Sequence, residues 1–105
     1  ESLPFPDGAF DVVFSFALTK HLPVALQSRV LAEFARVSRR GVISTFGVLD
    51  AISRPVWRRR GLVESFPVER EELARMAAGA GLRIEEMRKC TTPIGTERVV
   101  RFALR

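Results

Sequence analysis

Cysteine is nearly absent from this sequence of 105 residues. Cys90 is the single cysteine, so no disulfide can form within the chain. No other metal-ligating side chain lies near it in the sequence with the spacing of a metal site, and we expect no bound metal. An unpaired cysteine fits a reducing compartment, so the sequence predicts a cytoplasmic protein.

Long apolar runs are missing as well. No stretch reaches the roughly 20 residues that cross a bilayer, and we expect no membrane contact. The first residues lack the basic region and apolar core of a signal peptide. The hydrophobic fraction is nevertheless 47%, which excludes a disordered tail. Because the sequence starts at Glu1 with no targeting segment to account for this, we expect a piece of a longer chain.

Lysine is scarce, with two Lys against fifteen Arg, and the formal net charge is +5. A basic balance can favour a nucleic-acid partner. The basic residues are spread along the chain, however, apart from Arg54 and the triplet Arg58-Arg59-Arg60. No basic surface with interleaved aromatic residues is visible, which argues against nucleic-acid binding.

Apolar spacing predicts a strand, a helix and a second strand in the first half of the chain. The nearly continuous apolar run Phe10 to Phe16 is typical of a strand buried on both faces, as in parallel sheets. Val24 to Ser38 has helical spacing, with Pro23 suited to the first helical position. Gly41 is expected to stop this helix and to open the short strand Gly41 to Phe46. The three elements together form a βαβ unit.

The second half predicts one helix and an antiparallel hairpin. Gly47 to Pro67 has no clear period and reads as a long connection, with a short helical piece near Ile52 to Arg59. A helix is expected from Glu69 to Ala80, capped by Gly81. Strands are expected over Leu82 to Lys89 and Glu97 to Leu104. The predicted fold is therefore α/β, in the order β-α-β-α-β-β.

The amino-terminal phrase carries a family resemblance. Leu3-Pro4-Phe5-Pro6-Asp7, followed by Phe10-Asp11-Val12-Val13 and Ser15, resembles a stretch of the class I S-adenosylmethionine-dependent methyltransferases, in particular their quinone-biosynthesis-like branch. In that family the phrase lies before and along the fourth strand. The element order also resembles the carboxy-terminal half of the Rossmann-like methyltransferase fold, and the resemblance covers essentially all 105 residues. One departure is Ser38-Arg39-Arg40-Gly41, where the family usually has Pro-Gly-Gly.

The resemblance implies S-adenosylmethionine as cofactor and a small-molecule acceptor. It implies that Ser15, Phe16 and Ala17 lie under the methionine portion of the cofactor. It also implies that His21 lies near the acceptor, as a base or an orienting group, although a loop histidine near a helix start is the commoner case. Trp57 lies where relatives often cover the acceptor pocket, although the sequence slightly favours a solvated surface segment with a packed tryptophan.

The sequence leaves three functions open. The first is methyl transfer by a fragment that is inactive alone, because no Gly-x-Gly turn follows any predicted strand. The second is a cofactor-free binding or regulatory half-domain that pairs with a partner chain, and the third is a nucleic-acid methyltransferase. We also expect the strand Phe10 to Phe16 to present an open edge, giving homodimers or aggregates. Cys90 would be a rim thiol if its strand runs parallel to the first two.

Overall fold

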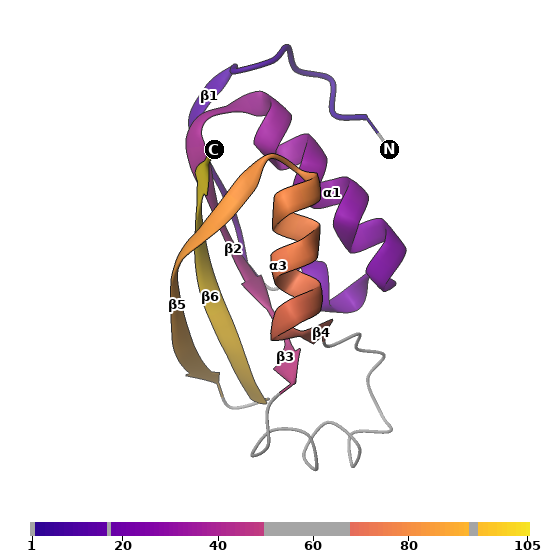
Figure 1. Cartoon of the computed structure of the whole chain (residues 1–105), viewed down its shortest axis with the longest axis vertical. Coiled ribbons are helices and arrows are strands. Elements are labelled where there is room, and N and C mark those ends of the chain that lie inside the picture. Colours follow the sequence, from indigo (N-terminus) through magenta and orange to yellow (C-terminus); the bar gives the residue numbers. More distant parts are fainter. Residues whose placement is uncertain (1, 17, 50–67, 93–94) are drawn as a thin grey trace.

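The computed structural model describes residues 2–16, 18–49, 68–92 and 95–105. Its main body is a four-stranded mixed sheet with two α-helices packed against it (Figure 1). In chain order the elements are β1 (Phe10–Ser15), the 3-10 helix η1 (Thr19–His21), α1 (Val24–Val37), β2 (Ser38–Phe46), β3 (Val48–Leu49), β4 (Val68–Glu69), α3 (Arg70–Gly79), β5 (Leu82–Thr92) and β6 (Gly95–Leu104).

Strand order in the main sheet is β1-β2-β6-β5. β1 pairs with β2 in parallel, which confirms the βαβ unit, and β5 pairs with β6 as the expected antiparallel hairpin. β6 also pairs antiparallel with β2, so it lies between β2 and β5. β5 consequently runs parallel to β1 and β2. The partial Rossmann-like α/β fold expected from the sequence is confirmed.

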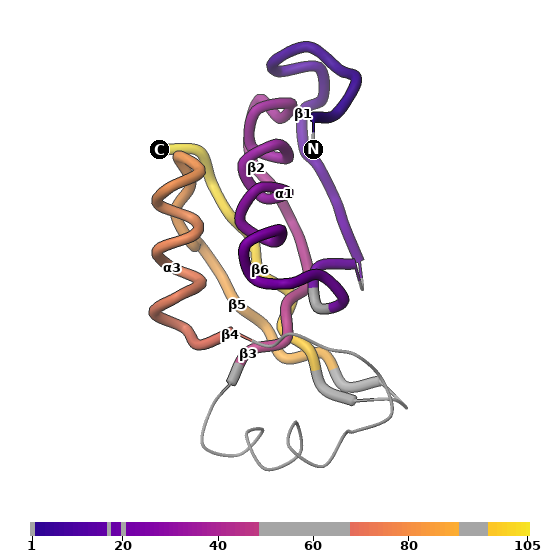
Figure 2. Tube along the Cα trace, turned by 90° about the vertical axis from the view of Figure 1, so that its right-hand side faces the viewer, coloured from indigo at the N-terminus to yellow at the C-terminus, as the bar shows by residue number. Residues whose placement is uncertain are grey.

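Both α-helices cover the same face of this sheet. Alternate side chains of β2 and β6, such as Val42, Phe46 and Phe102, join the core that α1 and α3 complete. The Phe46 and Phe102 rings meet edge to face, with centroids 6.0 Å apart. Leu31 of α1 and Leu73 of α3 are fully buried in this core. Turned by 90°, the molecule shows α1 and α3 side by side against the strands (Figure 2).

The apolar run of β1 is typical of a strand buried on both faces, but β1 is not buried in this way in the described residues; the open edge that we expected of it is present. Phe10, Val12 and Phe14 are 41%, 46% and 66% exposed. Within the described chain β1 is a terminal strand of the sheet, and β2 is its one neighbour. An apolar run shows that a strand can be buried on both faces. Whether it is buried depends on which other elements pack against it.

The predicted end of the first helix also differs from the structure. Ser38 follows α1 in an extended conformation (φ −97°, ψ 149°), and β2 begins at once. Gly41 is therefore a residue inside β2 rather than a helix stop. At the other end of α1, Pro23 is the N-cap residue (φ −54°, ψ 150°) and not the first helical residue. In α3, by contrast, Gly81 has φ +76° just beyond the last turn, as the sequence predicts.

A second, small sheet lies beyond the carboxyl end of β2. Val48 and Leu49 of β3 pair in parallel with Val68 and Glu69 of β4. Val48 and Val68 are buried in the main core. The sequence predicted an irregular connection here, because two-residue strands have no measurable period. The predicted short helix near Ile52 to Arg59 falls outside the described residues.

Candidate functional site

The carboxyl ends of β1 and β2 form one edge of the sheet, and this edge holds the candidate site. Parallel strands end on the same side, and ligands of open α/β sheets bind beyond that side. Ser15 ends β1 and lies opposite Ser44 of β2 in the pairing register. Ser15 is half-buried, and the next residue, Phe16, is 52% exposed. Ala17, the third residue expected at the cofactor, falls outside the described residues.

The segment after β1 is attached to β2 through Thr19. This side chain is fully buried, and its hydroxyl donates a hydrogen bond to the backbone oxygen of Thr45 near the end of β2. The backbone N–H of His21 donates to Leu18 at 3.1 Å, which closes the short helix η1. His21 is exposed at the end of η1. The structure thus places His21 in the connection that follows Ser15 and Phe16, and η1 contacts β2.

Ser44 is a site residue that sequence reasoning missed. Its side chain is fully buried, and its hydroxyl has no hydrogen-bond partner among the described residues. Its place between Val42 and Phe46 puts it on the helix-facing side of β2. A small polar residue at an inward position of an apolar strand was the available signal, and a buried hydroxyl without a partner is uncommon.

An ion-paired network fixes the segment that leads into β1. The Arg36 guanidinium contacts both oxygens of Glu33, at 2.8 and 3.1 Å, and Asp7 Oδ1 at 2.7 Å. Hydrogen bonds from Arg36 and from the Leu3 N–H lower the pKa of Glu33 to about 2. Hydrogen bonds to Glu33 and Asp7 raise the pKa of Arg36 above its ordinary value. All of these groups lie at the end of the sheet where β1 begins, opposite the candidate site.

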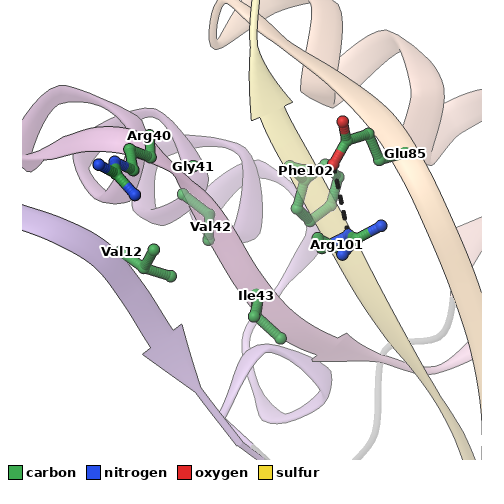
Figure 3. A pocket seen from close by; sticks show the side chains of 8 residues that line it. All are labelled: Val12, Arg40, Gly41, Val42, Ile43, Glu85, Arg101 and Phe102. Carbon is green, nitrogen blue, oxygen red and sulfur yellow. Dashed lines mark ion pairs between the residues drawn. The ribbon is translucent and has the colours of Figure 1, made fainter.

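The sheet face away from the helices carries a shallow hollow (Figure 3). Val12, Gly41 and Ile43 line its floor, and Arg101 beside it pairs with Glu85 at 3.3 Å. Its volume is about 170 Å³, and an apolar groove along β1 measures about 250 Å³. Both are smaller than the roughly 300–1,000 Å³ of typical small-molecule pockets. Neither is lined by Ser15 or Phe16.

Comparison with known proteins gives the fold a family context. A family model described as "Methyltransferase domain" matches residues 1–46, which contain β1, α1 and β2. A S-adenosylmethionine-dependent methyltransferase from Methanosarcina mazei superposes with a TM-score of 0.76 at 19% identity, over 98% of this chain and 63% of that chain. Magnesium protoporphyrin IX methyltransferase from Synechocystis PCC 6803, with bound SAH, gives a TM-score of 0.73 at 13% identity, over 90% of this chain and 45% of that chain. The described chain has the fold of S-adenosylmethionine-dependent methyltransferases.

This methyltransferase-like fold is shared by proteins of other descriptions. A protein described as a pericyclic reaction enzyme superposes with a TM-score of 0.69 at 16% identity, over 99% of this chain and 28% of that chain. Among curated proteins no relative matches the chain. The chain spans less than two thirds of the length of each of these three structures.

The remaining predicted site features are placed only in part. Cys90 is half-buried on β5, opposite Glu97 of β6. Because β5 runs parallel to β1 and β2, Cys90 lies toward the same edge of the sheet as Ser15, as the sequence reasoning anticipated for parallel strands. Trp57 and the triplet Arg58-Arg59-Arg60 fall outside the described residues.

Within the described ranges, no three His, Cys, Asp or Glu side chains are grouped so as to hold a metal ion. Neither of the helices in those ranges is long and apolar enough to cross a membrane.

Proposed function

We propose that this chain is part of an enzyme that transfers a methyl group from S-adenosylmethionine to a small-molecule acceptor. The observation that carries the proposal is the match of residues 1–46 to a methyltransferase-domain model. Those residues form the parallel pair β1 and β2, whose carboxyl ends make the candidate edge. A structural neighbour of the same fold holds SAH. The phrase Leu3 to Asp7 supports assignment to the quinone-biosynthesis-like branch, and the element order supports the carboxy-terminal half of the domain.

The proposed methyl transfer depends on aligning the acceptor with the methyl group more than on proton transfer by an acid or a base. S-adenosylmethionine supplies a methyl group on a sulfonium, and the leaving thioether is neutral. The protein therefore has to line up the acceptor and exclude water. Ser15, Phe16 and Ala17 would form the wall beside the methionine portion. The half-buried Ser15 hydroxyl and the exposed Phe16 ring fit a polar and an apolar part of that wall.

His21 and Trp57 are proposed on the acceptor side. A general base is needed only where the acceptor carries a proton of high pKa, and His21 is exposed in the connection after the cofactor wall. We propose that it binds or deprotonates the acceptor. Trp57 stays a prediction from sequence. A cytoplasmic location, predicted from the single cysteine, stays a prediction as well.

Cofactor binding by residues 1–105 alone is expected to be unmeasurable. No Gly-x-Gly turn follows a strand in this sequence, and such a turn holds the cofactor in Rossmann-like folds. The same argument makes these residues inactive without the rest of the cofactor site. Micromolar binding of S-adenosylmethionine to the 105-residue polypeptide in a calorimetric titration would contradict this expectation.

The test of the function uses the complete natural polypeptide that contains this chain. We expect calorimetric binding of S-adenosylmethionine, and we expect Ser15→Trp to abolish it because the indole fills the proposed methionine position. Ala78→Trp is the matched control, since Ala78 is exposed on α3, away from the edge. Absence of binding to the natural polypeptide would refute the function. Equal binding by natural protein and Ser15→Trp would refute the placement of the cofactor.

A second function is favoured by one observation, the open edge of β1. Six residues of β1 have a strand on one side only within the described chain, and their side chains are mostly exposed. Such an edge can pair with another chain. A cofactor-free binding or regulatory half-domain that pairs with a partner, or with a second copy of itself, would use this edge. Saturable cofactor binding by the natural polypeptide separates the first function from this one.

A further inference from the structure

The guanidinium of Arg36 uses every donor it has to hold one segment of chain. An arginine side chain carries five N–H donors. Two of these donors contact Glu33, and the other three contact Asp7 Oδ1, the backbone oxygen of Phe5 at 2.9 Å and that of Leu3 at 3.0 Å. The Leu3 N–H donates to Glu33 Oε1 at 2.7 Å. We call these contacts the Arg36 network.

Gly8 adds a backbone contact to the same turn of α1. Its N–H donates to the Arg36 backbone oxygen at 2.9 Å, and its φ of +64° is a conformation that suits glycine. This bond satisfies a carbonyl of the last helical turn, which has no partner within the helix. The chain from Leu3 to Gly8 is thus attached at several points to the end of α1. β1 begins two residues later, at Phe10.

β1 has few buried side chains that could fix its register, although Val13 packs partly against the core. β2 is its one neighbour among the described strands, and four of its six residues are exposed. The pairing with β2 already contains an irregularity between Phe10 and Val12. The side chains that a strand buries specify its register, and a slip of one residue turns every side chain to the other face. A slip would therefore move Ser15 away from its place opposite Ser44.

We propose that Arg36 is a positioning residue that fixes the register of β1 on β2 and thereby places Ser15 at the candidate site. The Arg36 network determines where the chain enters β1, and the length of β1 then determines where Ser15 lies at the far end. The part of this inference that concerns cofactor affinity rests on the proposed function. The part that concerns the register does not.

The register is tested by cross-linking in the complete natural polypeptide with Cys90→Ser. Phe14 and Ile43 are partners in the observed register, whereas Val12 would face Ile43 after a slip of two residues. We expect Phe14→Cys with Ile43→Cys to form a disulfide rapidly, and Val12→Cys with Ile43→Cys to do so slowly. Adding Arg36→Met should slow the first pair at least tenfold and speed the second. Arg29→Met, on an exposed position of the same helix, should change neither rate.

Cofactor affinity is the second measurement. Arg36→Met should weaken S-adenosylmethionine binding at least tenfold, whereas Arg29→Met should leave it unchanged. Where Arg36→Met does not fold, Arg36→Lys replaces it, because a lysine keeps the charge but cannot make the planar two-oxygen contact with Glu33. Unchanged cross-linking rates in the Arg36 variant would overturn the inference. A natural polypeptide that binds no cofactor would refute the proposed function, and the cross-linking result would still decide the register.

Discussion

Gly41 gives the sharpest stability prediction, because a single methyl group there meets the neighbouring strand. A Cβ built on Gly41 would lie 2.2 Å from the backbone oxygen of Phe102 and 3.5 Å from the Cα of Ala103. Both obstacles are backbone atoms of β6, which pairs with β2 at this point. A flexible side chain could move aside at little cost, but a paired strand cannot. Gly41→Ala therefore has to push β2 and β6 apart.

The expected cost follows from that displacement. The two strands must separate locally by roughly 1 Å or more, because nonbonded heavy atoms pack at about 3.5–4.0 Å. Overpacking of this kind costs about 1–3 kcal/mol, and each weakened ladder hydrogen bond adds about 0.5–1.5 kcal/mol. The smaller entropy of the unfolded alanine chain offsets about 0.4–1 kcal/mol. We expect a net loss of about 2–3 kcal/mol, which lowers the melting temperature by roughly 10–20 °C in a domain of this size.

Gly79→Ala is the matched control for this measurement. Gly79 is the last residue of α3, and a Cβ there has no atom within 4 Å. The same substitution should stabilise the protein by about 0.4–1 kcal/mol at this position. Thermal unfolding followed by circular dichroism on both variants gives the comparison. A melting temperature of Gly41→Ala within about 3 °C of the unsubstituted chain would refute the reasoning, since that shift corresponds to less than 1 kcal/mol.

Three further predictions concern Ser44, Glu33 and Phe14. Ser44→Ala should leave the unfolding free energy unchanged or raise it by up to about 1 kcal/mol, because the buried hydroxyl has no partner among the described residues; a clear loss in urea unfolding would show that the hydroxyl is bonded. The folded pKa of Glu33 is lowered to about 2, so its contribution to stability is present above its ordinary pKa and disappears as the pH falls toward 2. The melting temperature should therefore exceed that of Glu33→Gln at pH 6, and the difference should shrink between pH 4.5 and 2; a constant difference would contradict the pairing with Arg36. Phe14→Lys places a charge on the open edge of β1 and should lower self-association in sedimentation at several concentrations, whereas a chain that is monomeric with and without the substitution would contradict edge pairing.

Elements with long, regular patterns were predictable from sequence. The helical spacing of Val24 to Val37 and the acidic first turn of α3 placed both helices within one or two residues of their observed bounds. The apolar composition of β1 and the β-branched residues of β2 placed the parallel pair. These signals are local, since each depends on residues within one element, and local patterns are the part of a fold that a single sequence states most directly.

Features that depend on distant contacts were not predictable. Ser38, Arg39 and Arg40 have no marked strand preference, yet they extend β2, and Ser38 pairs there with the distant residue Phe10. The prediction of a β5–β6 hairpin does not say which of its two strands pairs with β2. In the structure that strand is β6, which lies between β2 and β5.

Some residues of the candidate site could also be predicted from local sequence patterns, and others depend on distant contacts. Ser15 and Phe16 were predicted from a motif that lies in one short stretch of the sequence, the loop from Leu3 and the strand that follows it. In the Arg36 network, Arg36 contacts Asp7 and Leu3, which precede it in the sequence by 29 and 33 positions. No local sequence pattern reveals contacts at this separation. The Glu33–Arg36 pair is visible as a helical i,i+3 spacing, but its contacts to Leu3 and Phe5 are not. Ser44 became a site residue only when the register placed it opposite Ser15.

The open edge of β1 can be compared with the edge at the other end of the described sheet. The two terminal strands of the described sheet differ in composition. β5 carries charged residues along its length, among them Arg83, Glu86 and Lys89, as expected of an edge that must not recruit other chains. β1 carries a single charged residue, Asp11, which pairs with Arg39 at 2.6 Å. The open edge of β1 is therefore less protected by charge than the edge of β5, which agrees with the pairing with another chain that we expect of it.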